Sequence, residues 1–314
     1  MASAPGKVIL FGEHAVVHGR PAVAVPVHSL RATVEALPAP AGAGLSIIAR
    51  DLGHTARWRD QADLLSAPPD DPLALIVRLT LDALSAPVPD LTLVLHSTIP
   101  IASNLGSGAA VSAALARALL EALGGTLDDD RLSALVYEVE KLHHGTPSGI
   151  DNSVVVYERP VYFVRGQPPK MFSIYRPFML AIADTGIPSP TKLAVSDVRR
   201  LCEQDPVRIS PIFDAIGMIA ENARLSIESG RVEPLGSLMN QNHALLQKLT
   251  VSCPELDALV SAAREAGALG AKLSGAGRGG NMIALAEGVD HGKLERALRA
   301  AGAVRVIFTA VTKG

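Results

Sequence analysis

The stretch HHGTPSGIDN, residues 143–152, is the most informative part of this 314-residue chain. It places one acidic residue, Asp151, at the end of a Gly/Pro/Ser loop and directly before the apolar run at residues 153–157. A carboxylate on a rigid turn flanked by small residues leaves space beside it for a substrate. Asp151 is therefore the first candidate catalytic residue.

Three glycine-containing segments frame this stretch: APGK at residues 4–7, NLGSGAA at residues 104–110 and KLSGAG at residues 272–277. The middle segment opens onto an Ala-rich run predicted to be helical. Backbone N–H groups at a helix N-terminus bind anions, and small residues let phosphate oxygens approach the backbone. Residues 102–110 therefore form either a phosphate-binding loop or a simple helix cap, and the spacing alone leaves both open.

The run GAGRGG at residues 275–280 matches the pattern G-x-G-x-x-G. A dinucleotide site needs a strand before that pattern, whereas residues 253–269 look helical, and too little chain remains for a two-half nucleotide fold. The sequence GxxxxGK[ST] does not occur. Neither a dinucleotide-binding fold nor a Walker-type NTPase is therefore expected.

Lys7 follows Pro-Gly and enters an apolar strand. A lysine in a buried strand usually has a carboxylate partner, and Asp151 is a candidate. Such a pair can orient a substrate hydroxyl and stabilise developing alkoxide charge. The alternative is a solvated lysine at a strand end. Glu140, on the predicted helix before the Asp151 loop, is by itself most simply a surface charge.

Composition argues for an ordinary globular protein. Hydrophobic residues make up 48% of the chain and charged residues 19%, with a net charge of −2, so a basic nucleic-acid-binding surface is not expected. The two cysteines have no CxxC or metal spacing, histidines 14, 18, 143 and 144 have no regular metal spacing, and the N-terminus lacks a secretory signal pattern. The most apolar helix candidate is too short and too charged to span a bilayer. We expect a cytoplasmic protein with neither a nucleic-acid nor a membrane partner.

Strand and helix patterns are mixed without a regular βαβ order, which favours the α+β class. Helices are predicted at residues 72–84, 109–123, 128–143, 191–203, 211–229, 235–249, 253–266 and 291–301. Strands are predicted at residues 7–12, 22–27, 29–37, 45–52, 91–96, 178–184, 282–285 and 304–311. A hairpin is predicted from residues 154–157 and 161–164.

Together, these motifs resemble those of the GHMP kinase superfamily. The first motif is APGKVILFGEHAVVHG at residues 4–19, the second lies at residues 100–110, the Asp151 loop follows, and the third lies at residues 272–280. They cover the start, middle and end of the chain in the family's order. The first motif and HGTPSGIDN at residues 144–152 look like the mevalonate kinase family in particular.

The resemblance implies a two-domain GHMP kinase fold of the α+β class. Residues 1–166 would form an N-terminal ATP-binding domain like domain 2 of ribosomal protein S5, and residues 167–314 a ferredoxin-like C-terminal domain. The implied reaction is Mg²⁺- and ATP-dependent phosphorylation of the C5 hydroxyl of mevalonate, in the mevalonate route to isoprenoids. The implied partners are mevalonate and ATP, and the family often forms homodimers.

The resemblance also implies roles for individual residues. Asp151 would act as base or electrostatic anchor for the reacting hydroxyl, Lys7 would pair with it, and Glu140 would hold Mg²⁺. Glu13 and His14 would lie near mevalonate. The implied ATP-binding residues are Ala102, Ser103, Asn104, Leu105, Gly106, Ser107, Gly108 and Ala109, and the third glycine loop contributes Ser274, Gly275, Ala276 and Gly277.

The chain departs from the family pattern at three positions. Gly108 replaces a serine that is a metal ligand in the family, so Ser107 or water would take that coordination position. Asn104 replaces a glycine, and asparagine tolerates left-handed backbone better than most residues. Arg278 interrupts the third glycine run, either to assist phosphate binding or as a solvated loop residue.

Other functions stay open at this point. One is another GHMP enzyme, such as a phosphomevalonate, homoserine or sugar kinase or a mevalonate-type decarboxylase. A phosphorylated substrate should need an extra Lys/Arg cluster, and the first motif shows only Lys7 and Arg20. The other is a GHMP-fold sensor that binds a ligand without turnover; the presence of Lys7, Glu140 and Asp151 argues against it.

Overall fold

The computed structural model describes residues 1–100, 103–144, 147–189 and 191–312. The chain divides into two compact units. Unit 1 comprises residues 1–6, 30–100 and 106–158, and unit 2 comprises residues 7–29, 101–105 and 159–314. Two long strands, β1 (Ala2–Phe11) and β2 (Ala22–Pro38), contribute residues to both units. The domain boundary expected near residue 166 stays a prediction.

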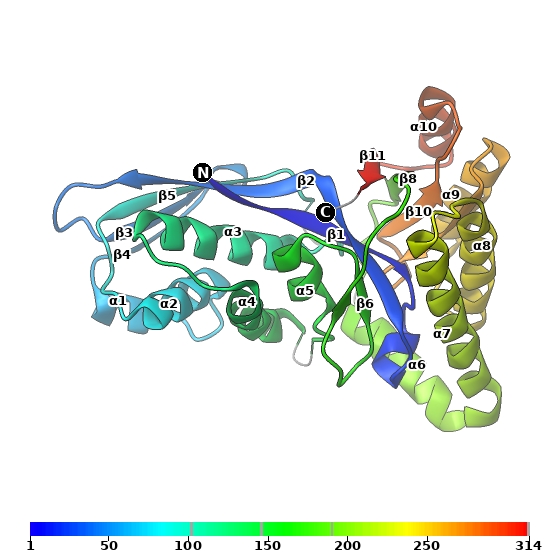
Figure 1. Ribbon diagram of the computed structural model, residues 1–314, viewed down its shortest axis with the longest axis horizontal. Coiled ribbons are helices and arrows are strands. Elements are labelled where there is room, and N and C mark those ends of the chain that lie inside the picture. Colours follow the sequence, from blue (N-terminus) through cyan, green and yellow to red (C-terminus); the bar gives the residue numbers. More distant parts are fainter. Residues whose placement is uncertain (101–102, 145–146, 190, 313–314) are drawn as a thin grey trace. The chain divides into compact units, whose positions relative to one another are not determined.

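Unit 1 is a sheet with helices (Figure 1). Besides the parts of β1 and β2, its elements are β3 (Leu45–Ala49), η2 (Arg50–Leu52), β4 (His54–Trp58), α1 (Gln61–Leu65), α2 (Pro72–Leu84), β5 (Leu91–Ser97), α3 (Ser107–Ala122), α4 (Asp129–His144) and α5 (Ile150–Tyr157). The strand order is β4-β3-β5-β2, with β3 parallel to β5 and the other pairs antiparallel.

Helix α3 lies at the centre of unit 1. It contacts β5, α2, α4 and α5, and its inward positions are mostly alanine, including the buried Ala109, Ala110, Ala113 and Ala114. Small side chains let neighbouring elements approach the helix backbone closely while still excluding water. The alanine-rich run after the second glycine motif is therefore a helix, as predicted, and its alanines are largely buried.

Unit 2 is built on an antiparallel four-stranded sheet with the order β11-β8-β10-β9. Its elements are η1 (Ala15–His18), β6 (Val161–Phe163), β7 (Lys170–Met171), β8 (Phe178–Asp184), α6 (Thr191–Gln204), α7 (Pro206–Glu228), α8 (Glu233–Lys248), α9 (Pro254–Glu265), β9 (Gly270–Ser274), β10 (Asn281–Leu285), α10 (His291–Ala300) and β11 (Arg305–Val311). Numbered within this sheet, the strand order is 4-1-3-2, the ferredoxin-like arrangement expected for the C-terminal part. The mixed α+β class is thus confirmed.

The core of unit 2 lies between this sheet and helices α7, α8 and α9. It includes Phe213 and Ile216 of α7, Leu259 of α9, Leu273 of β9 and Met282 of β10, all nearly inaccessible to water. Helices α8 and α9 pack directly on β9. The backbone of β9 is therefore fixed by two helices as well as by β10, which matters for the lysine that β9 carries.

Several predicted elements have the observed bounds, among them α2 and β8. The predicted hairpin at residues 154–164 is wrong, because residues 150–157 form helix α5. Its run of three valines favours a strand, but Gly149 starts a helix and tertiary packing buries those valines on α5. The two strands predicted around Pro26 are one strand: β2 pairs with β6 at Ala22–Ala24 and with β5 from Ala32, so Pro26 lies outside both ladders.

Two further differences concern the ends of elements, and a third is a strand that the sequence pattern does not predict. Strand β3 ends at Ala49, before the short helix η2. Helix α7 begins at Pro206 because Asp205 caps it by accepting a hydrogen bond from the Arg208 N–H. Strand β9 was not predicted, so the third glycine loop does follow a strand; it then leads into β10 rather than a helix, which still disagrees with a dinucleotide motif.

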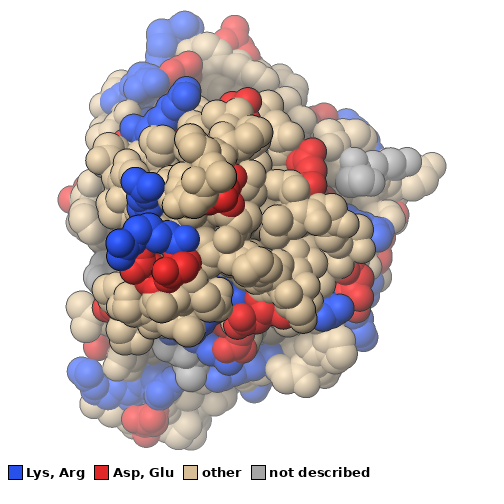
Figure 2. All heavy atoms as spheres, turned by 90° about the vertical axis from the view of Figure 1, so that its left-hand side faces the viewer, with Lys and Arg blue, Asp and Glu red and all other residues tan. Residues whose placement is uncertain are grey.

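Figure 2 shows acidic and basic side chains interspersed among other residues on the face it presents. The described helices include none with the length and apolar content needed to cross a lipid bilayer.

Candidate active site

In unit 2, the first motif ends β1 in a tight turn. Gly12 has φ of +101°, and a Cβ there would lie 2.4 Å from the Ala22 Cα, so only glycine fits. The turn carries Glu13 and His14 into the interior, where they are 1% and 5% exposed. His14 also has a positive φ of 60°. Two polar side chains buried together in a constrained turn are typical of a functional site rather than of packing.

Glu13 is held by a buried cation and an amide. Lys272 of β9 donates from Nζ to Glu13 Oε1, and both side chains are almost fully buried, at 0% and 1% exposed. Asn242 of α8 donates from Nδ2 to Glu13 Oε2 at 3.3 Å. Burial lowers the pKa of Lys272, while Glu13 opposes that shift. Both carboxylate oxygens are therefore fixed, at the cost of burying charge.

His14 is a second fixed group in this turn. Its Nε2 lies 2.9 Å from the Ala276 carbonyl oxygen in the third glycine loop, and burial lowers its pKa to about 4. With Nε2 donating to that carbonyl, the neutral ring keeps Nδ1 as an acceptor. In the described part of the chain, His14 Nδ1 and Asn242 Oδ1 are both buried without a hydrogen-bond partner. Buried polar atoms normally have a hydrogen-bond partner, so a ligand or a water molecule is expected to bind to these two.

Behind this turn, His243 of α8 supports β9. Its Nδ1 accepts a hydrogen bond from the Leu273 N–H at 3.3 Å, and its Nε2 lies 3.1 Å from Asp257 Oδ1. Burial lowers the pKa of His243 to about 4, although Asp257 opposes the shift. The neutral ring thus donates to Asp257 and accepts from β9, next to Lys272.

The third glycine loop presents backbone rather than side chains. Gly275, Gly277, Gly279 and Gly280 all have positive φ. A Cβ on Gly277 would lie 1.9 Å from the Val251 carbonyl oxygen, and one on Gly279 would lie 2.6 Å from the Ile187 carbonyl oxygen. Side chains are therefore sterically excluded at these positions, because the loop packs closely against the backbone at Val251 and Ile187, whose carbonyls accept from the Arg278 and Gly280 N–H groups.

Arg278, within that loop, forms an ion pair with Asp197 of α6 and has φ of 59°. Its Nε also donates to the Thr250 carbonyl at 3.4 Å. Arg278 is therefore a partly buried residue that connects the loop to α6 rather than a solvated loop residue, and its role in phosphate binding stays a prediction.

The segment at residues 103–105 lies against the same loop. The Lys7 N–H donates to the Leu105 carbonyl at 2.9 Å, and Asn281 Nδ2 donates to the Ser103 carbonyl. Asn104 has φ of 59°, as expected for a position where the family has glycine. Its Oδ1 accepts from Thr191 Oγ1 at 3.3 Å, whereas Nδ2 is buried and has no partner among the described residues. That Nδ2 is a donor placed beside Gly275 and Gly280.

Unit 2 thus brings together a large part of the expected site. Lys7, Glu13 and His14, residues 103–105 and residues 274–277 all belong to it. Lys7 is 4% exposed, which disagrees with a solvated strand-end lysine. Ala102 lies outside the described residues.

In unit 1, α3 begins at Ser107 after Gly106, whose φ is 75°. Gly108 and Ala109 follow in its first turn, so the predicted order of small-residue segment and then helix is confirmed. A helix N-terminus with small side chains exposes unpaired N–H groups to an anion.

Asp151 lies in the first turn of α5 and is partly exposed. The partial positive charge at a helix N-terminus interacts favourably with a carboxylate there. Asn152 donates to Ser133 Oγ of α4 at 2.8 Å, and Tyr137 of α4 donates to the Pro147 carbonyl at 3.4 Å. Glu140, 3% exposed, is on the same α4, so it is not the surface charge that its sequence context suggests.

Metal ligands are sparse in the described part of the chain, where no three His, Cys, Asp or Glu side chains cluster closely enough to hold a metal ion. A Mg²⁺ ion bound together with a phosphate group needs fewer protein ligands, because phosphate oxygens and water complete its shell. A buried carboxylate such as Glu140 and a hydroxyl such as Ser107 have the oxygen chemistry that Mg²⁺ prefers.

Lys272, Asn242 and His243 belong to the site although the sequence motifs do not indicate a role for them. The signal for Lys272 was the same one that selected Lys7: a lysine inside an apolar segment that leads into a glycine turn. Predicting β9 would have shown Lys272 to be buried and in need of an acid. Nothing in the sequence indicates that the acid is Glu13, 259 residues away.

The two buried histidines give a pH prediction. Folding lowers the pKa of each histidine from 6.5 to about 4. As the pH falls, the unfolded protein therefore takes up the proton at a higher pH than the folded protein does. The free energy of unfolding should therefore fall as pH decreases from about 6.5 to 4, by roughly 1–3 kcal/mol for each histidine. NMR titration should find His14 and His243 both neutral at pH 5.5. Titration of either ring near 6.5 would contradict the prediction.

Comparisons with known proteins agree with the motifs. The family model described as the GHMP kinases N terminal domain matches residues 74–159, and that described as GHMP kinases C terminal matches residues 220–304. The chain is 35% identical to mevalonate kinase of Pyrococcus furiosus over 329 residues, covering 98% of this chain and 95% of that protein. It is 36% identical to mevalonate kinase of Aeropyrum pernix, covering 95% and 90%.

Solved structures show the same relationship. The chain resembles the crystal structure of L. major mevalonate kinase in complex with R-mevalonate, with a TM-score of 0.85 and 30% identity over 99% of this chain and 95% of that one. It also resembles Methanococcus jannaschii mevalonate kinase, with a TM-score of 0.84 and 27% identity over 99% and 97%.

Proposed function

The chain belongs to the GHMP kinase family, and from that membership we propose that it transfers the γ-phosphoryl group of ATP to the C5 hydroxyl of mevalonate. The product would be mevalonate 5-phosphate, an intermediate on the route to isoprenoids. The observation that carries the proposal is similarity over nearly the full chain to proteins named mevalonate kinase, one of them solved with R-mevalonate.

We assign the ATP phosphates to two groups of backbone N–H donors. One is the segment from Ala102 to Ala109, with Gly106, Ser107 and Gly108 at the start of α3. The other is the third glycine loop, from Ser274 to Gly277. The buried Asn104 Nδ2, which has no partner among the described residues, supports the first assignment because a phosphate oxygen would accept from it.

We assign the reacting hydroxyl to Asp151, which would take its proton or hold it by charge. Lys7 would stabilise the negative charge that develops on the attacking oxygen. The two residues belong to different units, so their pairing rests on the family resemblance. In phosphoryl transfer most of the rate enhancement comes from such positioning and charge stabilisation.

We assign mevalonate binding to Glu13 and His14. Both are buried in one turn and fixed by Lys272, Asn242 and the Ala276 carbonyl. A site whose polar groups are already fixed loses little entropy when it binds a polar substrate, and it rejects analogues that leave those groups unpaired. His14 Nδ1, which has no hydrogen-bond partner among the residues that the structure describes, is the acceptor we assign to a substrate hydroxyl.

Mg²⁺, when bound with ATP, would neutralise phosphate charge in the transition state. Glu140 and Ser107 are the residues we assign to it, with water at the coordination position that Gly108 leaves without a hydroxyl. Glu140 is a carboxylate on α4, and carboxylate oxygens are ligands that Mg²⁺ prefers, which is consistent with this assignment.

A substrate panel tests the proposal. The purified chain is given ATP, Mg²⁺ and one candidate at a time: mevalonate, phosphomevalonate, homoserine or galactose. We expect the highest kcat/KM with mevalonate. A preference for a phosphorylated or sugar substrate would move the chain to another branch of the family, and ATP binding without any phosphorylated product would indicate a ligand sensor.

A further inference from the structure

Helix α5, which carries Asp151, has eight residues. An isolated helix of that length is not stable in water, so its position depends on what holds its two ends. Contacts with α4 hold the N-terminal end, through Asn152 and Ser133. Near the C-terminal end, Tyr157 also donates to Asp130 of α4. Further contacts at that end come from α3.

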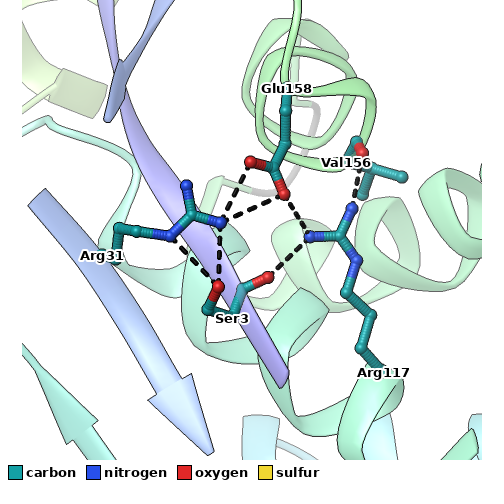
Figure 3. Close-up of polar contacts among 5 residues, drawn as sticks. All are labelled: Ser3, Arg31, Arg117, Val156 and Glu158. Carbon is teal, nitrogen blue, oxygen red and sulfur yellow. Dashed lines mark hydrogen bonds and ion pairs between the residues drawn. The ribbon is translucent and has the colours of Figure 1, made fainter. Parts of the chain in front are cut away.

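Arg117 of α3 holds the C-terminal end (Figure 3). Its Nη2 donates to the Val156 carbonyl at 2.7 Å, one of the last carbonyls of α5. Its Nη1 donates to Glu158 Oε1 at 2.7 Å and to the Ser3 carbonyl at 2.7 Å. A guanidinium at a helix C-terminus satisfies orphan carbonyls and interacts favourably with the helix dipole. One side chain thus connects α3, α5 and β1.

Glu158 completes this cluster. It is the C-cap residue of α5, with φ of 51°, and its carboxylate also accepts from Arg31 Nη2 at 3.0 Å. Arg31 in turn donates to Ser3 Oγ at 2.9 Å. The side chains of Arg31, Arg117 and Glu158 are 23–29% exposed, more buried than ordinary surface ion pairs. Their hydrogen bonds are therefore less weakened by water and salt.

The cluster connects the two helices of unit 1 that carry parts of the candidate site, α3 and α5. Helix α3 carries the phosphate-binding segment at its first turn, and Arg117 lies ten residues after Ser107, about 15 Å along the helix. Asp151 lies in the first turn of α5, and Glu158 caps its end. Because each helix is rigid over such lengths, joining them at Arg117 restricts the orientation of Asp151 relative to the start of α3.

We propose that Arg117 is a positioning residue: by binding Val156 and Glu158 it fixes α5, and with it Asp151, relative to the phosphate-binding end of α3. The catalytic part of this inference rests on the proposed function. A lysine at position 117 would keep the charge but not the planar fork that reaches three acceptors. A misplacement of about 1 Å in a reacting group can cost up to about 100-fold in rate.

The test compares Arg117→Lys with a matched control, Arg224→Lys. Arg224 is similarly buried, at 24% exposed, and donates to Glu221 and Glu228, all on α7 in unit 2. Two readouts are used at a temperature where both variants are folded: steady-state kinetics with ATP and mevalonate, and hydrogen exchange of the α5 amides by mass spectrometry.

We expect Arg117→Lys to lower kcat by about 10-fold, to change both KM values by less than about 3-fold, and to speed exchange at residues 150–157. Arg224→Lys should leave kcat, both KM values and the exchange of residues 150–157 close to those of the wild type. Unchanged α5 exchange in Arg117→Lys would overturn the inference whatever the activity, and faster exchange with unchanged kcat would overturn the catalytic part. If the wild-type protein does not phosphorylate mevalonate, the proposed function fails, and the exchange data alone decide whether Arg117 fixes α5.

Discussion

Replacing Asp151 with asparagine is expected to lower kcat for mevalonate by about 10²- to 10⁴-fold, the range that a positioned acid–base group contributes. The amide is nearly the same size as the carboxylate but carries no charge and cannot take the hydroxyl proton. Because Asp151 lies in the first turn of α5, where asparagine is tolerated, the fold should be retained. ATP is assigned to other residues, so its affinity should stay close to that of the wild type.

The measurement is single-turnover phosphorylation of mevalonate, together with ATP affinity by calorimetry. Asp129→Asn is a suitable control, because Asp129 is exposed in the first turn of α4. It should leave kcat within about 2-fold of wild type, since an exposed substitution removes only a weak, screened interaction. If Asp151→Asn has wild-type turnover, Asp151 is neither the base nor the anchor of the hydroxyl.

The second large effect is expected from Lys272→Met. Methionine fills much of the same space but leaves the Glu13 carboxylate buried without its cation. Removal of one partner of a buried ion pair typically lowers the free energy of unfolding by about 3–5 kcal/mol. Activity should fall as well, because Glu13 would lose the partner that fixes one of its carboxylate oxygens. Urea unfolding and the mevalonate KM are the quantities to measure.

A double variant separates the missing cation from lost packing. In Glu13→Gln/Lys272→Met the buried charge is gone, so the loss of stability should be clearly smaller than the sum of the two single losses. Lys141→Met removes an exposed lysine whose side chain is 44% exposed and pairs with Glu138; it should cost only about 0–1 kcal/mol. If Lys272→Met and Lys141→Met lower the free energy of unfolding equally, then removing Lys272 does not leave a costly unpaired charge on the buried Glu13.

How far the sequence predicts the fold depends on how local each signal is. Helix α2 has its observed bounds because Asp71 caps it, Pro72 starts it and its apolar residues recur at helical spacing. Helix α5 could not be predicted that way. Its valines favour a strand locally, whereas burial of those valines and the contacts of Asn152, Val156 and Glu158 with neighbouring elements favour the helix.

The candidate site likewise contains some features that a local motif predicts and others that depend on contacts between distant residues. Glycine motifs are local, so the turn at Gly12, the start of α3 and the loop after β9 are visible in the sequence. The partners of buried charges are not, because Glu13 meets Lys272 and Asn242 only after unit 2 has folded. Position 104 lies between these cases: a left-handed residue is expected there from the motif, but the contact of Asn104 with Thr191 is not.

The most direct test of the central claim is the identity of the phosphorylated product. The chain is incubated with ATP, Mg²⁺ and R-mevalonate, and the product is analysed by mass spectrometry and by phosphorus–proton coupling in NMR. We predict one new phosphomonoester, coupled to the C5 methylene protons and formed only when mevalonate is present. A product phosphorylated at the C3 hydroxyl, or ADP release with no mevalonate-derived phosphate ester, would contradict the assignment.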